Sequence, residues 1–278
     1  RWNSPRNSLR SGAMIESSQN EAIKILRRVR RTRGTEAVLE GPHLVLEALR
    51  LGLRLQPVVA TEEFLGSAVG QEVGARLPRP PLVAAARILE QLADADSPRG
   101  LLAVCSLPRT GLEGVTPRPP EIWLYLDRIQ DPGNLGALAR VAEALGAAGL
   151  VLSPGCADPN HSRALRASAG SLLRVPVAVH AEPAATAERF RADPAQEVRW
   201  IGLEAHAGAL PLAELGPRGS AETIVLALGA EGPGLSAPTR AQLHASVTIP
   251  LAGRLESLNV TVAAALVLAR LAPPLTPP

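Results

Sequence analysis

The sequence predicts an α/β protein made of two domains. Short apolar stretches typical of β-strands alternate with segments whose apolar residues recur at helical spacing, along nearly the whole chain. A stretch rich in Pro and Gly, residues 106–120, interrupts this alternation and is typical of a linker. After it the alternation becomes tighter, which favours a mostly parallel sheet.

The first domain is predicted to be a small α/β domain that spans residues 14–105. Residues 1–13 precede Met14, the only methionine, and we interpret them as an upstream extension outside the fold. Helices are expected where apolar residues recur every three or four positions, and strands where the apolar runs are short. The expected elements are a helix at 20–33, a strand at 37–39, a helix at 43–51, strands at 55–60 and 82–84, a helix at 87–92 and a strand at 101–105.

The second domain is predicted at residues 121–273. Its expected strands lie at 122–126, 150–152, 175–179, 200–203, 223–228 and 247–249, and its expected helices at 135–145, 162–172, 185–191, 238–244 and 258–271. Parallel sheets bind their ligands at the carboxyl ends of the strands. Function is therefore expected in the loops that follow Leu126, Leu228 and Ile249.

Composition argues against several classes of protein. No apolar run reaches the ~18–20 residues that cross a bilayer, and no signal-peptide pattern is present. Cys105 and Cys156 lie far apart and the five histidines are scattered, so neither a disulfide framework nor a metal site is expected. We therefore expect a cytoplasmic protein without a membrane segment or a bound metal. A nucleotide-linked oxidoreductase fits the α/β pattern, but the dinucleotide and P-loop fingerprints are missing.

Positive charge is concentrated near the N-terminus. Nine Lys and Arg against two acidic residues give +7 for residues 1–33, whereas the remainder carries −4. Such a patch suits contact with the phosphates of a nucleic acid, although a solvated helix face would have the same pattern. Six of these nine basic residues lie close together between positions 24 and 33, namely Lys24, Arg27, Arg28, Arg30, Arg31 and Arg33.

The first of the three loops, DRIQDPGNLG at 127–136, leads into a predicted helix that carries Arg140. Asn134 stands where a helix N-cap is expected, and capping alone would explain a polar residue there. Arg140 lies in the first turns of an apolar helix, where its charge opposes the helix dipole. A phosphate-binding site would account for this arginine, because a guanidinium matches the geometry of a phosphate.

The other two loops also have unusual sequences. In LGAEGPGLS at 228–236, three glycines permit close approach of the backbone to a ligand, and a turn alone would not require Glu231 at a strand end. The stretch IPLAGRLESLN at 249–259 precedes a run of small residues suited to close helix packing. Ser257 could cap this last helix, and Asn259 is a poor helix former for its first turn.

Together these loops resemble the SpoU, or TrmH-type, family of RNA 2′-O-ribose methyltransferases, part of the SPOUT superfamily. The matching stretches follow the family's order, with LDRIQDPGNLGALARVAEALGAAGLVL at 126–152, LALGAEGPGLS at 226–236 and IPLAGRLESLNVTVAAALVLARL at 249–271. The segment RALRASAGSLLRVPV at 163–177 is similar to the family's substrate-side helix. Residues 20–105 resemble the family's N-terminal RNA-binding domain, which has an L30e-like fold.

The resemblance implies a SPOUT-type α/β domain with a mostly parallel sheet and a C-terminal deep trefoil knot, an exception to the rule against knotted chains. It implies homodimers with an active site completed at the interface. It also implies that S-adenosylmethionine is the cofactor and is held mainly by backbone groups. The residues implied in cofactor binding are Gly229, Gly234, Ile249, Leu251 and Leu258.

A catalytic set follows from the same resemblance, with Arg140 at its centre and Asn134, Glu231, Ser257 and Asn259 around it. A guanidinium almost never releases its proton, so we expect Arg140 to hold a phosphate and stabilise the developing alkoxide rather than act as a base. Glu231 and Asn259 are expected to orient Arg140 and the ribose. Arg166 and the basic N-terminal residues are expected to bind RNA.

The expected function is therefore methylation of a ribose 2′-hydroxyl in structured RNA. The N-terminal domain favours ribosomal RNA, 23S-like, over transfer RNA. Three alternatives stay open: a transfer-RNA 2′-O-methyltransferase, a non-catalytic RNA-binding factor in ribosome assembly, and a methyltransferase that confers antibiotic resistance.

Overall fold

The structure is a computed structural model that describes residues 14–32, 34–93, 99–107, 109–206, 208–216, 219, 221–253 and 257–271. It divides into two compact units, residues 1–107 and 108–278. The boundary lies two residues beyond the predicted end of the first domain. The proposed extension at 1–13 and the basic residue Arg33 lie outside the described residues.

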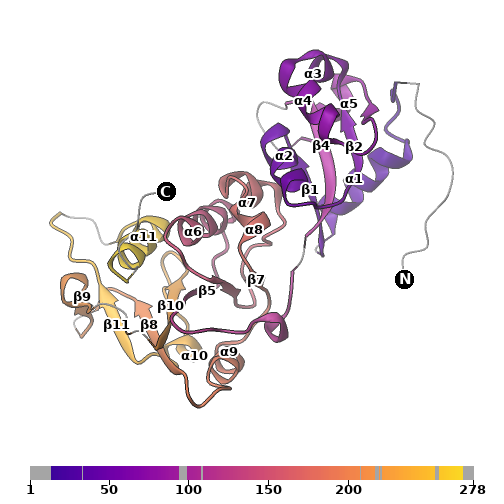
Figure 1. The fold of residues 1–278 in the computed structure, drawn as a ribbon. Coiled ribbons are helices and arrows are strands. Elements are labelled where there is room, and N and C mark those ends of the chain that lie inside the picture. The colour runs from indigo at the N-terminus through magenta and orange to yellow at the C-terminus, as the bar shows by residue number, and fades with distance from the viewer. Residues whose placement is uncertain are drawn as a thin grey trace. The chain divides into compact units, whose positions relative to one another are not determined.

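The first unit contains a four-stranded mixed sheet with helices on both of its faces (Figure 1). Its elements are α1 (Glu21–Arg31), β1 (Glu36–Glu40), α2 (Pro42–Arg50), β2 (Leu55–Ala60), α3 (Glu62–Gly66), α4 (Ala68–Arg76), β3 (Leu82–Val83), α5 (Ala86–Glu90) and β4 (Leu101–Ser106). The strand order is β1-β4-β2-β3, with β4 antiparallel to both of its neighbours and β2 parallel to β3. Every strand and helix predicted for this half is confirmed.

Helix α1 packs on this sheet through an apolar stripe. Ile23 and Leu26 are fully buried and share one core with Val59 and Leu102 of the sheet and with residues of α5. Helices α3 and α4 were not predicted, because α4 buries only Gly70 and Val73 and so lacks the apolar spacing that indicates a helix.

The second unit contains a seven-stranded sheet in which every recorded strand pairing is parallel. Its strands are β5 (Ile122–Asp127), β6 (Gly149–Leu152), β7 (Val177–Ala178), β8 (Glu197–Leu203), β9 (Leu210–Pro211), β10 (Glu222–Gly229) and β11 (Ala245–Thr248). They lie in the order β7-β6-β5-β10-β8-β11-β9. The prediction of a mostly parallel sheet is therefore confirmed, and the short edge strand β9 is an addition.

Two layers of helices cover this sheet (Figure 1). The helices are α6 (Pro132–Ala144), α7 (Ser162–Ala167), α8 (Ser171–Arg174), α9 (Pro183–Phe190), α10 (Ala237–Arg240) and α11 (Val260–Leu271). On one face α6 packs against α7, α8 and α11, and on the other α9 packs against α10. The two central strands β5 and β10 are buried between these layers, which explains why their sequences are continuous apolar runs.

The start of α6 is fixed by a polar cap and by a close contact with α7. Asp131 is the N-cap, because its side chain accepts a hydrogen bond from the Asn134 amide at 2.8 Å, and Pro132 occupies the first helical position. A Cβ on Gly136 would lie 2.1 Å from the carbonyl oxygen of Ala164, so only glycine permits this helix spacing. The N-cap therefore lies three residues before Asn134, the residue expected at that position.

Two segments differ from their predicted form. The helix expected at 162–172 is divided into α7 and α8, because Ala169 and Gly170 adopt left-handed conformations with φ of 48° and 92°. In the segment expected to be a linker, a 3₁₀ turn at Leu112–Gly114 precedes Val115, which is buried in the core of the second unit. In the part of the chain that the structure describes, no helix is long and apolar enough to span a bilayer.

Candidate functional site

Three side chains from distant parts of the sequence form a hydrogen-bonded triangle at the carboxyl end of the sheet. Asn134 Nδ2 donates to Glu231 Oε1 at 2.9 Å. Asn259 Nδ2 donates to the same Glu231 oxygen and to Asn134 Oδ1, both at 3.2 Å. We call these three residues the polar triangle. The structure thus brings together three of the five residues of the predicted catalytic set, one from each predicted loop.

Local structure holds two members of the polar triangle in place. Asn134 lies in the first turn of α6, whose cap Asp131 also forms an ion pair with Arg163 at 3.1 Å. Asn259 begins α11, because its Oδ1 accepts from the Thr261 amide at 2.9 Å and its carbonyl accepts from the Ala263 amide. The helix therefore begins one residue after Asn259, so Asn259 is its cap and does not lie inside the first turn, contrary to expectation. The alternative in which Ser257 caps this helix is thereby excluded.

A cavity of about 670 Å³ opens beside Glu231. Its walls come from the segments that follow β8, β10 and β11 and from the start of α11. This volume is in the range that encloses nucleoside-sized ligands. All five residues expected to bind the cofactor line this cavity, namely Gly229, Gly234, Ile249, Leu251 and Leu258. Glu231 and Ser257 of the predicted catalytic set line it too.

The glycine-rich loop folds back tightly on itself at the edge of this cavity. The Gly234 amide donates to the Ala230 carbonyl at 2.9 Å. A Cβ on Gly229 would lie 2.2 Å from the carbonyl carbon of Gly234, so only glycine permits this close approach. The loop therefore presents main-chain groups to the cavity and carries Glu231 at its exposed tip.

Arg140 lies on α6 but does not belong to the polar triangle. Its side chain is exposed, and among the described residues it has no hydrogen bond or ion pair. We expected Glu231 and Asn259 to orient Arg140, and within this chain they instead bind Asn134. The physical reason is helical geometry: six residues along α6 turn Arg140 well away from the face that carries Asn134.

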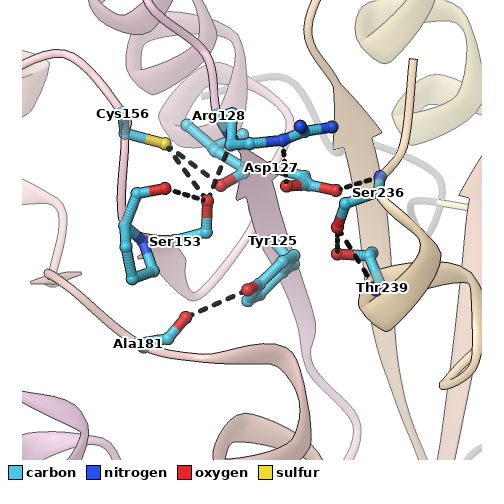
Figure 2. Close-up of polar contacts among 10 residues, drawn as sticks. Tyr125, Asp127, Arg128, Ser153, Cys156, Ala181, Ser236 and Thr239 are labelled. Atoms are coloured by element: carbon cyan, nitrogen blue, oxygen red, sulfur yellow. Dashed lines mark hydrogen bonds and ion pairs between the residues drawn. The ribbon is translucent and has the colours of Figure 1, made fainter. Parts of the chain in front are cut away.

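A buried carboxylate that the sequence motifs did not indicate ties two of the loops together. Asp127, at the end of β5, has a side chain that is only 2% exposed. Its Oδ2 accepts from the Ser236 amide at 2.6 Å, and its Oδ1 accepts from Arg128 Nε at 3.2 Å (Figure 2). Ser236 in turn caps α10. Asp127 therefore anchors the far end of the glycine-rich loop to the centre of the sheet.

The residues around Asp127 form a second polar cluster (Figure 2), and they are not among the residues that line the cavity. Arg128 has a left-handed backbone with φ of 56°, and its amide donates to Ser153 Oγ at 2.9 Å. Cys156 Sγ donates to the Leu126 carbonyl at 3.1 Å, and burial raises the pKa of its thiol. Burial, and next the charge of Asp127, raise the pKa of Tyr125. The thiol and the phenol are therefore neutral packing groups.

Glu204 and Arg240 are a further polar pair that the sequence analysis did not identify. Arg240 Nε donates to Glu204 Oε1 at 2.6 Å, and both residues line the cavity. The signal available in the sequence was the position of each carboxylate: Asp127 ends one apolar strand, and Glu204 directly follows another. In the described residues, no group of three or more His, Cys, Asp and Glu side chains is arranged to hold a metal ion.

In the first unit, the predicted basic residues of α1 differ in how accessible they are. Lys24, Arg28 and Arg31 are exposed and, at spacings of four and three, lie along one face of the helix. Arg27 is half-buried and its Nη1 donates to the Ser18 carbonyl at 3.4 Å. Arg30 forms an ion pair with Glu40, and its side chain is 14% exposed. Arg30 is therefore less available to a phosphate than the three exposed residues.

Arg166, the remaining residue expected to contact RNA, lies in α7 of the second unit and is half-buried. Its neighbour Arg163 is more exposed and lies beside the N-terminus of α6, through its ion pair with Asp131. Sequence analysis did not single out Arg163.

Comparison with known families and proteins gives a consistent result. Residues 121–269 match the model of the SpoU rRNA Methylase family. The 23S rRNA (guanosine(2553)-2′-O)-methyltransferase RlmP of Bacillus subtilis is 32% identical over 257 residues, which cover 91% of this chain and 96% of that protein.

Solved structures agree with the sequence comparison. The AdoMet-bound rRNA methyltransferase of Sinorhizobium meliloti superposes with a TM-score of 0.78 at 26% identity and covers 93% of this chain and 96% of its own. The SpoU methyltransferase AviRb of Streptomyces viridochromogenes, in complex with AdoMet, gives a TM-score of 0.80 at 26% identity, with coverage of 91% and 97%. The likeness therefore extends over both units of the chain.

Proposed function

Because the chain belongs to the SpoU rRNA methylase family, we infer that it transfers a methyl group from S-adenosylmethionine to the 2′-hydroxyl of a ribose in RNA. We propose that this RNA is ribosomal. The relative RlmP is named for 2′-O-methylation of 23S rRNA, and the likeness to it covers the N-terminal unit as well as the family domain. We further propose that the N-terminal unit binds this RNA and that the protein acts in the cytoplasm.

The observation that carries this function is the polar triangle at the mouth of the cavity. Glu231 belongs to both features, because its Oε1 accepts from Asn134 and Asn259 while the residue lines the cavity. Glu231 Oε2 has no hydrogen-bond partner among the described residues. A ligand in the cavity and a substrate at its exposed mouth would therefore meet at one carboxylate.

The residues of the cavity fit S-adenosylmethionine. Apolar side chains such as Leu203, Ile249 and Leu251 suit the adenine ring, and the folded glycine-rich loop offers main-chain hydrogen-bonding groups. When bound, this molecule supplies a methyl group on a positively charged sulfur, a strong electrophile. The protein must then align the oxygen of the 2′-hydroxyl with that methyl group and favour loss of the hydroxyl proton.

We propose that Glu231 Oε2 accepts a hydrogen bond from the 2′-hydroxyl and so directs the oxygen towards the cavity. Asn134 and Asn259 hold the carboxylate in this orientation through its other oxygen. Ser257 is exposed and lines the same cavity, and we propose that it also contacts the ribose of the RNA. The polar triangle thus orients the substrate, and its amides prevent rotation of the carboxylate.

We propose that the protein is a homodimer and that Arg140 acts on the RNA ribose bound at the active site of the partner subunit. The exposed Arg140 guanidinium has no partner in the described part of the chain and lies outside the polar triangle, which supports a role across an interface. Helix α11, which packs on α6, exposes Val262 and Leu266, and such apolar side chains suit burial in a subunit interface. In this role Arg140 holds the adjacent phosphate and stabilises the charge that develops on the oxygen.

Family membership also supports two parts of the fold that we propose here, the trefoil knot around the cavity and the L30e-like fold of the first unit. A knot would make the backbone of the glycine-rich loop rigid, which is what main-chain recognition of a ligand requires.

The test of the function is to map 2′-O-methylation across total RNA from wild-type and deletion cells, with calorimetry of the purified protein and S-adenosylmethionine. We expect one ribosomal position to lose its methyl group in the deletion strain. A lost transfer-RNA position would support the alternative substrate. The absence of any lost position, together with no heat of binding, would support a non-catalytic assembly factor and contradict the proposal.

A further inference from the structure

A polar pair lies in the cavity away from the polar triangle. Glu204 directly follows β8, and its amide donates to the Val247 carbonyl of β11 at 3.1 Å, which fixes the main chain. Its carboxylate is 10% exposed, and Arg240 Nε donates to its Oε1 at 2.6 Å. Among the residues that the structure describes, its Oε2 has one contact, a long one of 3.5 Å from Ser246 Oγ. An ionised carboxylate oxygen can accept more than this, so Oε2 has capacity for a donor from a ligand.

The order of the strands places this pair at the end of the cavity away from the reacting groups. Asn134 comes after β5 in the chain, Glu231 after β10 and Glu204 after β8. In the sheet, β10 lies between β5 and β8. A ligand whose reactive group lies beside the polar triangle would therefore present a more distant part of itself to Glu204. The neighbours of Glu204 in the cavity wall include Leu203, Ile249 and Leu251, which favour an apolar ring nearby.

We propose that Glu204 binds the ribose of the cofactor by accepting a hydrogen bond from one of its hydroxyl groups, and that Arg240 positions Glu204 for this contact. The inference rests on the proposed function, because it takes S-adenosylmethionine as the ligand of the cavity. A carboxylate whose charge is already balanced by a guanidinium suits a neutral hydroxyl donor, since Arg240 would repel the ammonium group of the methionine tail. Mostly apolar walls likewise suit adenosine better than that charged tail.

The experiment is calorimetric titration with S-adenosylhomocysteine and its 2′-deoxy and 3′-deoxy analogues. The proteins are wild type, Glu204→Gln, and the control Glu143→Gln. The control breaks an ion pair between Glu143 of α6 and Arg174 of α8, neither of which lines the cavity. In wild type and the control, we expect one deoxy analogue to bind about tenfold more weakly, because a hydrogen bond to a charged group is lost. In Glu204→Gln, we expect the parent ligand to bind about tenfold more weakly and the deoxy analogue to show little further loss.

For each protein, the quantity compared is the ratio of the dissociation constants of two ligands. Partial unfolding of a variant changes both constants equally and leaves this ratio unaffected. Equal loss on removal of the hydroxyl in all three proteins would overturn the proposal. So would a Glu204→Gln defect that disappears with 5′-methylthioadenosine, which has the ribose but no amino acid, because Glu204 would then bind the methionine tail. If wild type binds none of these ligands, the proposed function itself fails, which is a different result from loss of the Glu204 effect alone.

Arg240→Met tests the positioning role separately. Removing the guanidinium should weaken binding of the parent ligand. The loss of affinity caused by removing the ribose hydroxyl should become only partly smaller, because Glu204 remains but is less well held. An unchanged deoxy penalty and unchanged affinity would overturn the role of Arg240.

Discussion

Asn134 and Glu231 are 97 residues apart in the chain and are joined by a 2.9 Å hydrogen bond from the amide of one to the carboxylate of the other. This bond links the first loop to the second, and Asn259 brings in the third. We predict that Asn134→Ala and Glu231→Ala each lower kcat by about 10²-fold, because the substrate oxygen is no longer oriented. Methyl transfer from labelled S-adenosylmethionine to transcribed RNA measures this effect.

Because the two side chains act as one unit, the double variant should be little worse than either single variant. If the fold losses in kcat of the two single variants multiply in the double variant, Asn134 and Glu231 act independently, contrary to the geometry. Unchanged melting temperatures in the single variants would separate this effect from loss of folding.

Asp127 is expected to control the position of the glycine-rich loop. Asp127→Ala removes the acceptor of the Ser236 amide and leaves that partly buried amide without this hydrogen bond. We predict a loss of about 1–3 kcal/mol in the free energy of unfolding and weaker binding of S-adenosylmethionine. Denaturant unfolding and calorimetry measure the two quantities, with Glu188→Gln, an exposed carboxylate on α9, as the control. Equal stability of both variants would contradict the anchoring role.

Arg140 provides a test of the dimer. If it acts on the partner's substrate, Arg140→Ala and Glu231→Ala homodimers should each be nearly inactive. Mixed dimers of the two should recover activity, because one of their two sites then has both residues intact. Mixing, refolding and assay at constant total protein check this, and size-exclusion chromatography with light scattering gives the mass. No recovery in mixed dimers of confirmed mass would place Arg140 and Glu231 in the same subunit's site.

The exposed stripe of α1 should contribute most of the salt dependence of RNA binding. Replacing Lys24, Arg28 and Arg31 by Gln removes three exposed cations, and the slope of log K against log salt should fall by about two to three. Arg30→Gln is the matched control, because the Arg30 side chain is only 14% exposed and pairs with the buried Glu40 carboxylate, whereas Arg28, which pairs with Glu36, is 57% exposed. Filter binding at several salt concentrations measures both, and cofactor affinity should not change. Equal slopes for wild type and the triple variant would contradict RNA contact by this stripe.

His244 should make stability depend on pH. Its Nδ1 accepts from the Trp200 amide at 3.0 Å, which requires an unprotonated nitrogen. Partial burial, and then the charges of Arg191 and Arg199, lower its pKa below the usual value of about 6.5. The unfolded chain therefore takes up a proton more readily than the folded chain. We predict that the contribution of His244 to stability is constant above about pH 6.5 and is lost as the pH drops below that value.

An NMR titration of the His244 ring and unfolding curves at several pH values check this prediction. In His244→Asn the slope of stability against pH in this range should become smaller. A pKa for His244 above 6.5 would contradict the sign.

Most of the fold follows from periodicity, and the failures have local causes. The strands β5 and β10 are apolar throughout and could be predicted because they are covered on both faces. The predicted helix at 162–172 failed at Ala169, a non-glycine residue with positive φ, because its sequence gives no sign of a break. Helix α4 escaped prediction because it buries little apolar surface.

The site divides in the same way. Glu231 could be predicted because a carboxylate beside glycines at a strand end is unusual in a simple turn. Asn134 and Asn259 resemble helix caps, and only the folded chain reveals that their amides share one carboxylate oxygen. Asp127 and Glu204 each lie next to an apolar strand, but the partners that give them a role are 109 and 36 residues away. No rule of local spacing connects such pairs.

Asn259 has one further consequence through its place at the start of α11. The same side chain that closes the polar triangle also begins the helix, since its Oδ1 accepts from the Thr261 amide while its Nδ2 donates to Glu231 and Asn134. Fraying of the first turn of this helix would release the amide from both partners together. Heating should therefore inactivate the enzyme reversibly, several degrees before the rest of the molecule melts.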